Sequence, residues 1–149
     1  MSNIVTGLLP LWIQKGKVMH NTWYHIENIE TVDSPSIVLY KEHLAYNIGK
    51  MVSLVDGQTD RLMPHIKTNK MPKVMQLMLE SGIQKFKAST ISEAEIAAEA
   101  GAATVLIAHQ LVGPKVDRLL NMIPQYPATE FSTLVDNVDS AELLNQKAE

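Results

Sequence analysis

Residues 63–70 read Met63-Pro64-His65-Ile66-Lys67-Thr68-Asn69-Lys70 and lie between two segments with helical periodicity. The stretch places two lysines, a histidine and a threonine at the end of a predicted short strand. A lysine at a strand end is well placed for carbonyl chemistry, because its amine forms a Schiff base where the site favours the neutral amine. The alternative is a solvated basic turn without a chemical role, since short motifs also occur by chance.

Strand and helix patterns alternate on both sides of this stretch. Strands are predicted at residues 36–40, 61–66, 84–88, 104–108 and 131–135. Helices are predicted after each strand, because apolar residues recur there at helical spacing and glycine or proline stands at the ends. The helix that follows residues 84–88 has two capping-box registers open to it, Ser92 with Glu95 and Thr90 with Glu93.

Such alternation implies parallel strands joined by helical crossovers, which is an α/β fold. The repeat length from residue 61 onward suits a (β/α) barrel as well as an open sheet, and in both the ligand site lies at the carboxyl ends of the strands. The polar residues expected at those ends are Lys67, Ser89-Thr90, His109-Gln110 and Asp136-Asn137. The chain holds only about four βα units, whereas a closed barrel needs eight. We therefore expect part of a longer protein, as a fragment, a truncation or a shortened gene product.

Composition restricts the classes of partner. The 149 residues carry a net charge of −3, so there is no basic excess to neutralise phosphates, and we expect no nucleic-acid partner. Cysteine is absent, which excludes disulfides, thiolate nucleophiles and cysteine-ligated zinc. No apolar run approaches the ~20 residues of a spanning helix, so we expect no membrane partner and a cytoplasmic location. His20, His25 and His43 lack metal-ligand spacing, and no metal site is predicted.

The lysine stretch resembles the signature of a known enzyme group. Pro64-His65-Ile66-Lys67-Thr68-x-Lys70 looks like the motif of the D-threonine aldolase and D-serine dehydratase group, within the alanine racemase-like (fold-type III) pyridoxal-phosphate enzymes. Further segments that fit are Ser34-Pro35-Ser36, Asn47-Ile48, Ala88-Ser89-Thr90-Ile91-Ser92-Glu93-Ala94-Glu95, Gln110-Leu111-Val112-Gly113-Pro114-Lys115 and Val135-Asp136-Asn137. The resemblance runs from about Trp23 to Glu149.

The resemblance implies an incomplete (β/α)8 TIM barrel of the alanine racemase N-terminal type, with about four βα units. Residues 22–149 would form the N-terminal half of a pyridoxal-phosphate-binding barrel. Residues 1–21 would be an N-terminal extension that is poorly ordered or outside the family match, with Met19 as an alternative start.

The resemblance also implies roles for individual residues. The motif lysine, here Lys67, would form the Schiff base with pyridoxal phosphate and act as a base at the substrate α-carbon, with the cofactor as electron sink. His65, Thr90 and Gln110 would lie in the cofactor pocket. The alternative for His65 is a hydrogen-bonded core histidine, and the alternative for Thr90 is a helix cap.

The implied reaction is retro-aldol cleavage of a small D-3-hydroxy amino acid to glycine and an aldehyde. D-serine dehydration and amino acid racemisation stay open, because all three reactions begin with the same bond between cofactor and substrate amine. The alternative of another class is a catalytically inactive, truncated barrel fragment. A pyridoxal-phosphate carrier protein of related fold is a further hypothesis, although those proteins are complete barrels.

Three positions depart from the family pattern, since Met63 stands for arginine, Asn69 for histidine and His109 for tyrosine. Each change removes a donor or a ring near the expected cofactor, and an asparagine cannot relay a proton as imidazole can. In the family, the main phosphate loops and the ligands of a divalent metal come from later segments, so we expect neither in this chain. Half a barrel exposes two strand edges, and we expect a homo-oligomer or association with the missing half.

Overall fold

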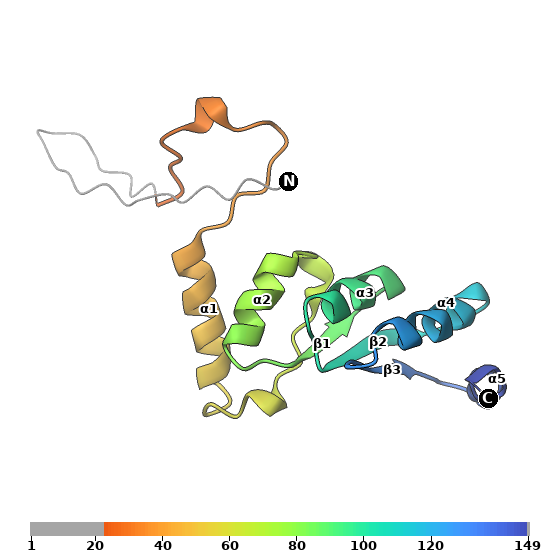
Figure 1. Cartoon of the computed structure of the whole chain (residues 1–149). Helices are drawn as coiled ribbons and strands as arrows, with labels where there is room; N and C mark the ends of the chain where they lie inside the picture. The colour runs from red at the N-terminus through yellow and green to blue at the C-terminus, as the bar shows by residue number, and fades with distance from the viewer. Residues whose placement is uncertain (1–22, 149) are drawn as a thin grey trace, which may run out of the picture. The chain divides into compact units, whose positions relative to one another are not determined.

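The computed structural model describes residues 23–148 of the chain (Figure 1). The chain divides into two compact units, Met1–Asn47 and Ile48–Glu149. The predicted N-terminal extension, residues 1–21, lies outside the described residues, and so does the alternative start at Met19.

The described elements alternate between helix and strand from α2 to α5. In chain order they are η1 (Ile29–Thr31), α1 (Lys41–Ser53), η2 (Thr59–Arg61), η3 (Ile66–Thr68), α2 (Pro72–Glu80), β1 (Lys85–Ala88), α3 (Ile91–Glu99), β2 (Thr104–Gln110), α4 (Pro114–Met122), η4 (Ile123–Gln125), β3 (Glu130–Leu134) and α5 (Val138–Ala148), where η marks a short 3-10 turn. The three strands coincide, apart from their end residues, with those predicted at 84–88, 104–108 and 131–135. Within residues 23–148, no helix is both long enough and apolar enough to cross a membrane.

The described part of the first unit holds a cluster of rings. Trp23 packs against Tyr40 and His43, with ring centroids 5.0 and 4.7 Å apart. The Tyr40 hydroxyl donates a hydrogen bond to the Tyr24 carbonyl oxygen over 2.7 Å. The strand predicted at 36–40 does not form, because no neighbouring strand in the described part of the chain pairs with it.

β1, β2 and β3 form a three-stranded parallel sheet in that order. In its register, Val105 of β2 pairs with Phe86 of β1 and with Phe131 of β3, so these three side chains share one face. Phe86 and Val105 are completely buried, because α3 packs against β1 and β2 on this face (Figure 1). The arrangement of parallel strands with helical crossovers confirms the predicted partial (β/α) barrel.

The opposite face of the sheet is more open. Lys85, Lys87 and Leu106 are half-buried there, and Ser132 is exposed. The amine of Lys85 donates to the carbonyl oxygen of Asp60 over 2.9 Å. The core of the second unit therefore lies between the sheet and its helices, on one side only of the described strands.

The prediction of a strand at residues 61–66 is wrong for most of these residues. A single parallel bridge between His65 and Lys87 takes its place and is followed by η3. The Lys87 N–H donates to the Pro64 carbonyl oxygen over 3.0 Å. Proline has no N–H to donate in return, so the ladder does not extend through Pro64. The first of the predicted βα units therefore begins with one bridge where a strand was expected.

Candidate functional site

Lys67 lies on η3, directly after the bridge that joins His65 to β1. Because this pairing is parallel, the chain leaves the bridge at the same edge of the sheet as the carboxyl end of β1. The Lys67 side chain is exposed there, and its amine makes no hydrogen bond or ion pair with any residue from 23 to 148. An accessible primary amine at a strand end is what Schiff-base chemistry requires.

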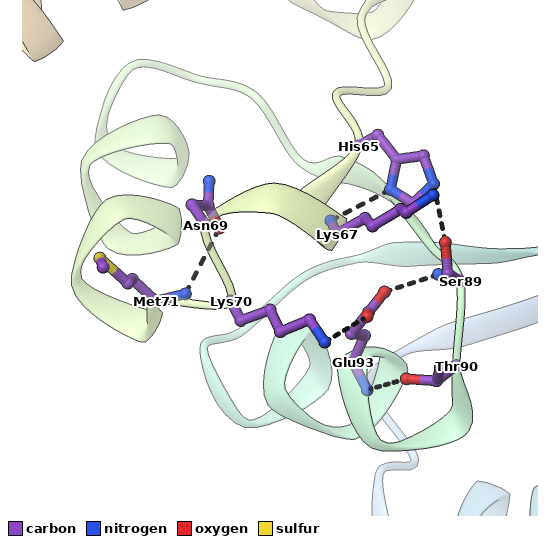
Figure 2. Close-up of polar contacts among 8 residues, drawn as sticks. All are labelled: His65, Lys67, Asn69, Lys70, Met71, Ser89, Thr90 and Glu93. Atoms are coloured by element: carbon purple, nitrogen blue, oxygen red, sulfur yellow. Dashed lines mark hydrogen bonds and ion pairs between the residues drawn. The ribbon is translucent and has the colours of Figure 1, made fainter. Parts of the chain in front are cut away.

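His65 connects the lysine loop to the end of β1 (Figure 2). Its Nδ1 accepts the backbone N–H of Lys67 over 3.1 Å, and its Nε2 lies 3.2 Å from the Ser89 hydroxyl oxygen. Because Nδ1 accepts, the network assigns the ring proton to Nε2, which then donates to Ser89. Of the two predictions for this half-buried residue, the hydrogen-bonded histidine agrees with these contacts, and its place beside a cofactor stays a prediction.

Glu93 lies under the same edge, on the first turn of α3. Its side chain is 3% exposed, one carboxylate oxygen accepts the Ser89 N–H over 2.7 Å, and the other lies 3.2 Å from the Lys70 amine. Burial acts to raise the pKa of Glu93, but the hydrogen bond from Ser89 and the charge of Lys70 outweigh it and hold that pKa below its ordinary value. The carboxylate is therefore ionised at neutral pH.

Thr90 caps α3. Its hydroxyl oxygen accepts the Glu93 N–H over 3.1 Å, which selects the Thr90–Glu93 register over Ser92–Glu95. The Glu93 side chain bonds the N–H of Ser89, whereas a standard capping box would return it to the N–H of the cap residue. The helix-cap alternative for Thr90 is confirmed, and its contact with a cofactor stays a prediction.

Gln110 is placed away from this network, at the carboxyl ends of β2 and β3. With its amide nitrogen facing the Asp136 carboxylate over 2.9 Å, its oxygen accepts from the Asn137 side chain over 3.1 Å and from the Ser140 hydroxyl. These contacts fasten the loop between β3 and α5. The structure therefore brings His65, Lys67 and Thr90 together on neighbouring segments, and it gives Gln110 a different set of partners.

His109 lies on an irregularity in β2. The register of β2 with β3 shifts between Ile107 and Gln110, so the ladder opens at His109. The His109 carbonyl oxygen accepts from the Thr133 hydroxyl over 3.0 Å. Its Nδ1 is buried without a hydrogen-bond partner among the described residues. The sequence marks this position as a polar residue at a strand end and as a departure from the family pattern.

The sequence predicted Ser89 only as one of the polar residues at the strand ends, and it did not single out Glu93 as a site residue. Ser89 is the partner of His65, and Glu93 is the partner of Lys70. The Thr90–Glu93 spacing was the signal available for Glu93, but it indicates a helix cap and not an ion pair.

Pyridoxal phosphate, which the resemblance implies, has an aldehyde end and a phosphate end. The accessible amine of Lys67 fits the aldehyde end. At the start of α3, the Ser89 N–H is bound by Glu93 and the Glu93 N–H by Thr90, so neither of these two donors is available to the phosphate. In the described part of the chain, no three His, Asp or Glu side chains are grouped to hold a metal ion.

A parallel sheet with helical crossovers and a lysine at a strand end is the arrangement expected of part of a (β/α) barrel. The chain belongs to the family of the alanine racemase N-terminal domain, whose model matches residues 40–149. This confirms the resemblance found in the sequence.

Two enzymes are similar in sequence to most of this chain. Over 118 residues the chain is 27% identical to a D-threo-3-hydroxyaspartate dehydratase from Delftia sp. (strain HT23), a match that covers 79% of this chain and 30% of that protein. Over 115 residues it is 29% identical to a D-threonine aldolase from Arthrobacter sp., with 77% of this chain and 30% of that protein covered. The chain thus spans about 30% of the length of these relatives.

A solved structure agrees with these matches. The crystal structure of D-threonine aldolase from Filomicrobium marinum superposes with a TM-score of 0.68 at 26% identity. The superposition covers 77% of this chain and 31% of that one. The agreement in fold therefore extends over most of this chain and over the corresponding part of a longer enzyme.

Proposed function

We propose that this chain is the lysine-bearing part of a pyridoxal-phosphate-dependent lyase that acts on D-amino acids. The observation that carries the proposal is the exposed Lys67 amine at the strand edge, on a backbone whose N–H is bound by His65. The matches to D-threonine aldolases and to a D-threo-3-hydroxyaspartate dehydratase support it. The finer part of the proposal is retro-aldol cleavage of a D-3-hydroxy amino acid.

Lys67 is the residue that would hold the cofactor. Bound pyridoxal phosphate supplies an electron sink for the negative charge that develops at the substrate α-carbon. The amine of Lys67, when it is not bound to the cofactor, would accept or deliver a proton at that carbon. His65 accepts the Lys67 N–H and so orients the lysine backbone, and Ser89 keeps the His65 ring in place.

The substrate class follows from the names of two relatives. D-threonine and D-threo-3-hydroxyaspartate both carry a hydroxyl on the carbon next to the α-carbon. In retro-aldol cleavage the bond between these two carbons breaks, the hydroxyl proton is lost, and the α-carbon gains a proton to give glycine and an aldehyde. In dehydration the α-proton and the hydroxyl leave as water, and a water molecule then hydrolyses the resulting imine to a 2-oxo acid and ammonia. The match to a D-threo-3-hydroxyaspartate dehydratase is the observation that supports dehydration as the second candidate reaction.

A second function class is an inactive barrel fragment. The observation in its favour is the open face of the sheet, together with a chain that spans about 30% of its relatives. In this case the catalytic unit would be a homo-oligomer or an assembly with the rest of a barrel. A cytoplasmic location and the absence of a nucleic-acid partner also stay predictions.

The experiment that tests cofactor attachment adds pyridoxal phosphate to the purified chain and records its visible absorption band. We expect a band in the wild type, none in Lys67→Ala, and an unchanged band in Lys73→Ala, which removes a nearby exposed lysine. A band that persists in Lys67→Ala would remove Lys67 from its role. A wild type without a band would contradict attachment by this chain.

Product analysis separates the reactions. D-threonine is added to the loaded chain, and glycine with acetaldehyde is measured beside 2-oxobutanoate with ammonia. Glycine and aldehyde support the aldolase, whereas 2-oxo acid and ammonia support the dehydratase. A loaded chain that releases neither pair and does not change the configuration of D-threonine at the α-carbon supports the inactive fragment, whereas inversion at that carbon supports a racemase.

A further inference from the structure

Two side-chain contacts, one before Lys67 and one after it, join the loop that carries Lys67 to the turn between β1 and α3 (Figure 2). Before Lys67, His65 is hydrogen-bonded to the Ser89 hydroxyl. After it, the Lys70 amine pairs with Glu93 over 3.2 Å. Ser89 and Glu93 belong to the same turn between β1 and α3, and the Ser89 N–H donates to the Glu93 carboxylate. The two contacts therefore form one connected network around Lys67.

Glu93 is buried in a way that packing alone does not explain. A buried carboxylate is unfavourable unless it is paired and hydrogen-bonded. Both of its oxygens are used, one by the Ser89 N–H and the other by Lys70. Both partners lie beside the lysine loop and not in the apolar core. The carboxylate therefore joins the start of α3 to the segment that carries Lys67.

Lys70 adds a second unusual feature. Its φ is 47°, in the left-handed region that residues other than glycine rarely adopt. Its N–H donates to the Ile66 carbonyl oxygen over 2.9 Å, which closes the turn around Lys67. Strained residues persist where the surrounding contacts fix them, and they gather at functional sites. The ion pair with Glu93 is the side-chain contact that holds Lys70 here.

From these contacts, and resting on the function proposed above, we propose that Ser89 and Glu93 are positioning residues for Lys67. They hold the loop on both sides, so that the Lys67 amine stays at the strand edge. Glu93 gives one oxygen to Ser89 and the other to Lys70, and neither oxygen is paired with the Lys67 amine. Among the described residues, the network therefore leaves the Lys67 amine unpaired and the Lys70 amine paired.

The test is chemical labelling of the full chain. The protein is incubated with pyridoxal phosphate and reduced with borohydride, and mass spectrometry measures the label at each lysine. We expect the wild type to be labelled faster at Lys67 than at Lys70. In Glu93→Gln the rate of labelling at Lys67 should fall roughly tenfold or more, because small displacements of reacting groups reduce rates steeply. Labelling at Lys70 should then rise, because its amine has lost its partner.

Two matched variants make the comparison specific. Glu95→Gln removes the same charge from the same helix and should leave both labelling rates unchanged. Lys70→Met breaks the ion pair from its exposed side, so it tests the network if Glu93→Gln fails to fold. We expect Lys70→Met to slow labelling at Lys67 as Glu93→Gln does.

Ser89 is tested by the pair Ser89→Ala and Ser89→Thr. Removal of the hydroxyl should slow labelling at Lys67, and threonine, which keeps a hydroxyl, should restore most of the rate. Nitrogen NMR of the cofactor-free chain gives an independent readout. The His65 Nε2 resonance should shift in Ser89→Ala, because its hydrogen-bond partner is lost, and should stay in place in Glu95→Gln.

The outcomes separate this inference from the proposed function. If the wild type is labelled at Lys67 and both Glu93→Gln and Lys70→Met are labelled there equally fast, the positioning role is overturned while the function stands. A wild type without label at Lys67 overturns the proposed function. Hydrogen exchange of the Lys67 amide then decides the positioning role, because exchange unchanged in Glu93→Gln and Ser89→Ala contradicts it.

Discussion

Glu93→Gln should lower the free energy of unfolding by about 1 kcal/mol at neutral pH. Glutamine keeps an oxygen for the Ser89 N–H but loses the charge, and a charge-assisted hydrogen bond contributes about 1.5–3 kcal/mol against about 0.5–1.5 for a neutral one. The pair with Lys70, which is 57% exposed, adds less than about 1 kcal/mol. The neutral amide avoids part of the desolvation cost of the carboxylate, which brings the net loss down to about 1 kcal/mol.

The loss of unfolding free energy in Glu93→Gln should depend on pH in a defined direction. Burial acts to raise the pKa of Glu93, but the Ser89 N–H and Lys70 lower it by more, so the folded pKa lies below the ordinary 4.5. The stabilisation that comes from the charge is then complete at pH values above the pKa of Glu93 in the unfolded chain. It is lost as the pH falls through the pKa of Glu93 in the folded chain. The difference in unfolding free energy between wild type and Glu93→Gln should be present at neutral pH and should close as the pH falls through the folded pKa of Glu93.

Urea unfolding measured at a series of pH values checks both statements. Glu95→Gln serves as the control, because it lies on the same helix and its carboxylate has neither of the two partners. Two results would refute the reasoning. One is a variant as stable as the wild type at neutral pH, and the other is a gap of constant size down to the acid limit.

Three further substitutions test the fold around the site. Phe86→Ala should cost about 3–5 kcal/mol in urea unfolding, because the ring is completely buried, and a cost below about 1 kcal/mol would contradict that placement. Thr90→Ala should cost about 1 kcal/mol by uncapping α3, whereas Thr90→Ser keeps the cap oxygen; equal losses in the two would argue against the cap. Asn137→Ala should speed amide exchange at Ser140, whose N–H donates to the Asn137 side chain over 2.8 Å, and unchanged exchange would count against that bond.

The sheet could be predicted from the sequence because its signals are local. The segment 104–108 is an apolar run with turn residues beyond it, and such a run identifies a strand without knowledge of its neighbours. The segments 36–40 and 61–66 look similar but depend on partners that periodicity does not reveal. The segment 36–40 pairs with no neighbouring strand in the described part of the chain. The segment 61–66 forms only a single bridge beside Pro64.

The position of Lys67 at the strand edge was predictable from the sequence, but the contacts that hold its loop were not. The motif and the family resemblance single out Lys67, and its chemical role stays a prediction. The contacts of Glu93 with Lys70 and Ser89 depend on how α3 packs against the lysine loop, which no spacing rule contains. Gln110 lies at a strand end as expected, yet its partners come from the segment after β3, which its position in the sequence does not reveal.

The one-sided burial of the sheet has a consequence for how the sequence tolerates change. Along β1, burial alternates residue by residue: Phe86 and Ala88 are completely buried, and Lys85 and Lys87 are half-buried. In a complete library of single substitutions, odd-numbered positions of this strand should accept polar and charged residues, whereas even-numbered positions should reject them. Covering the open face with another layer of protein would abolish that contrast, so a substitution profile of β1 would report whether the face is covered in the cell.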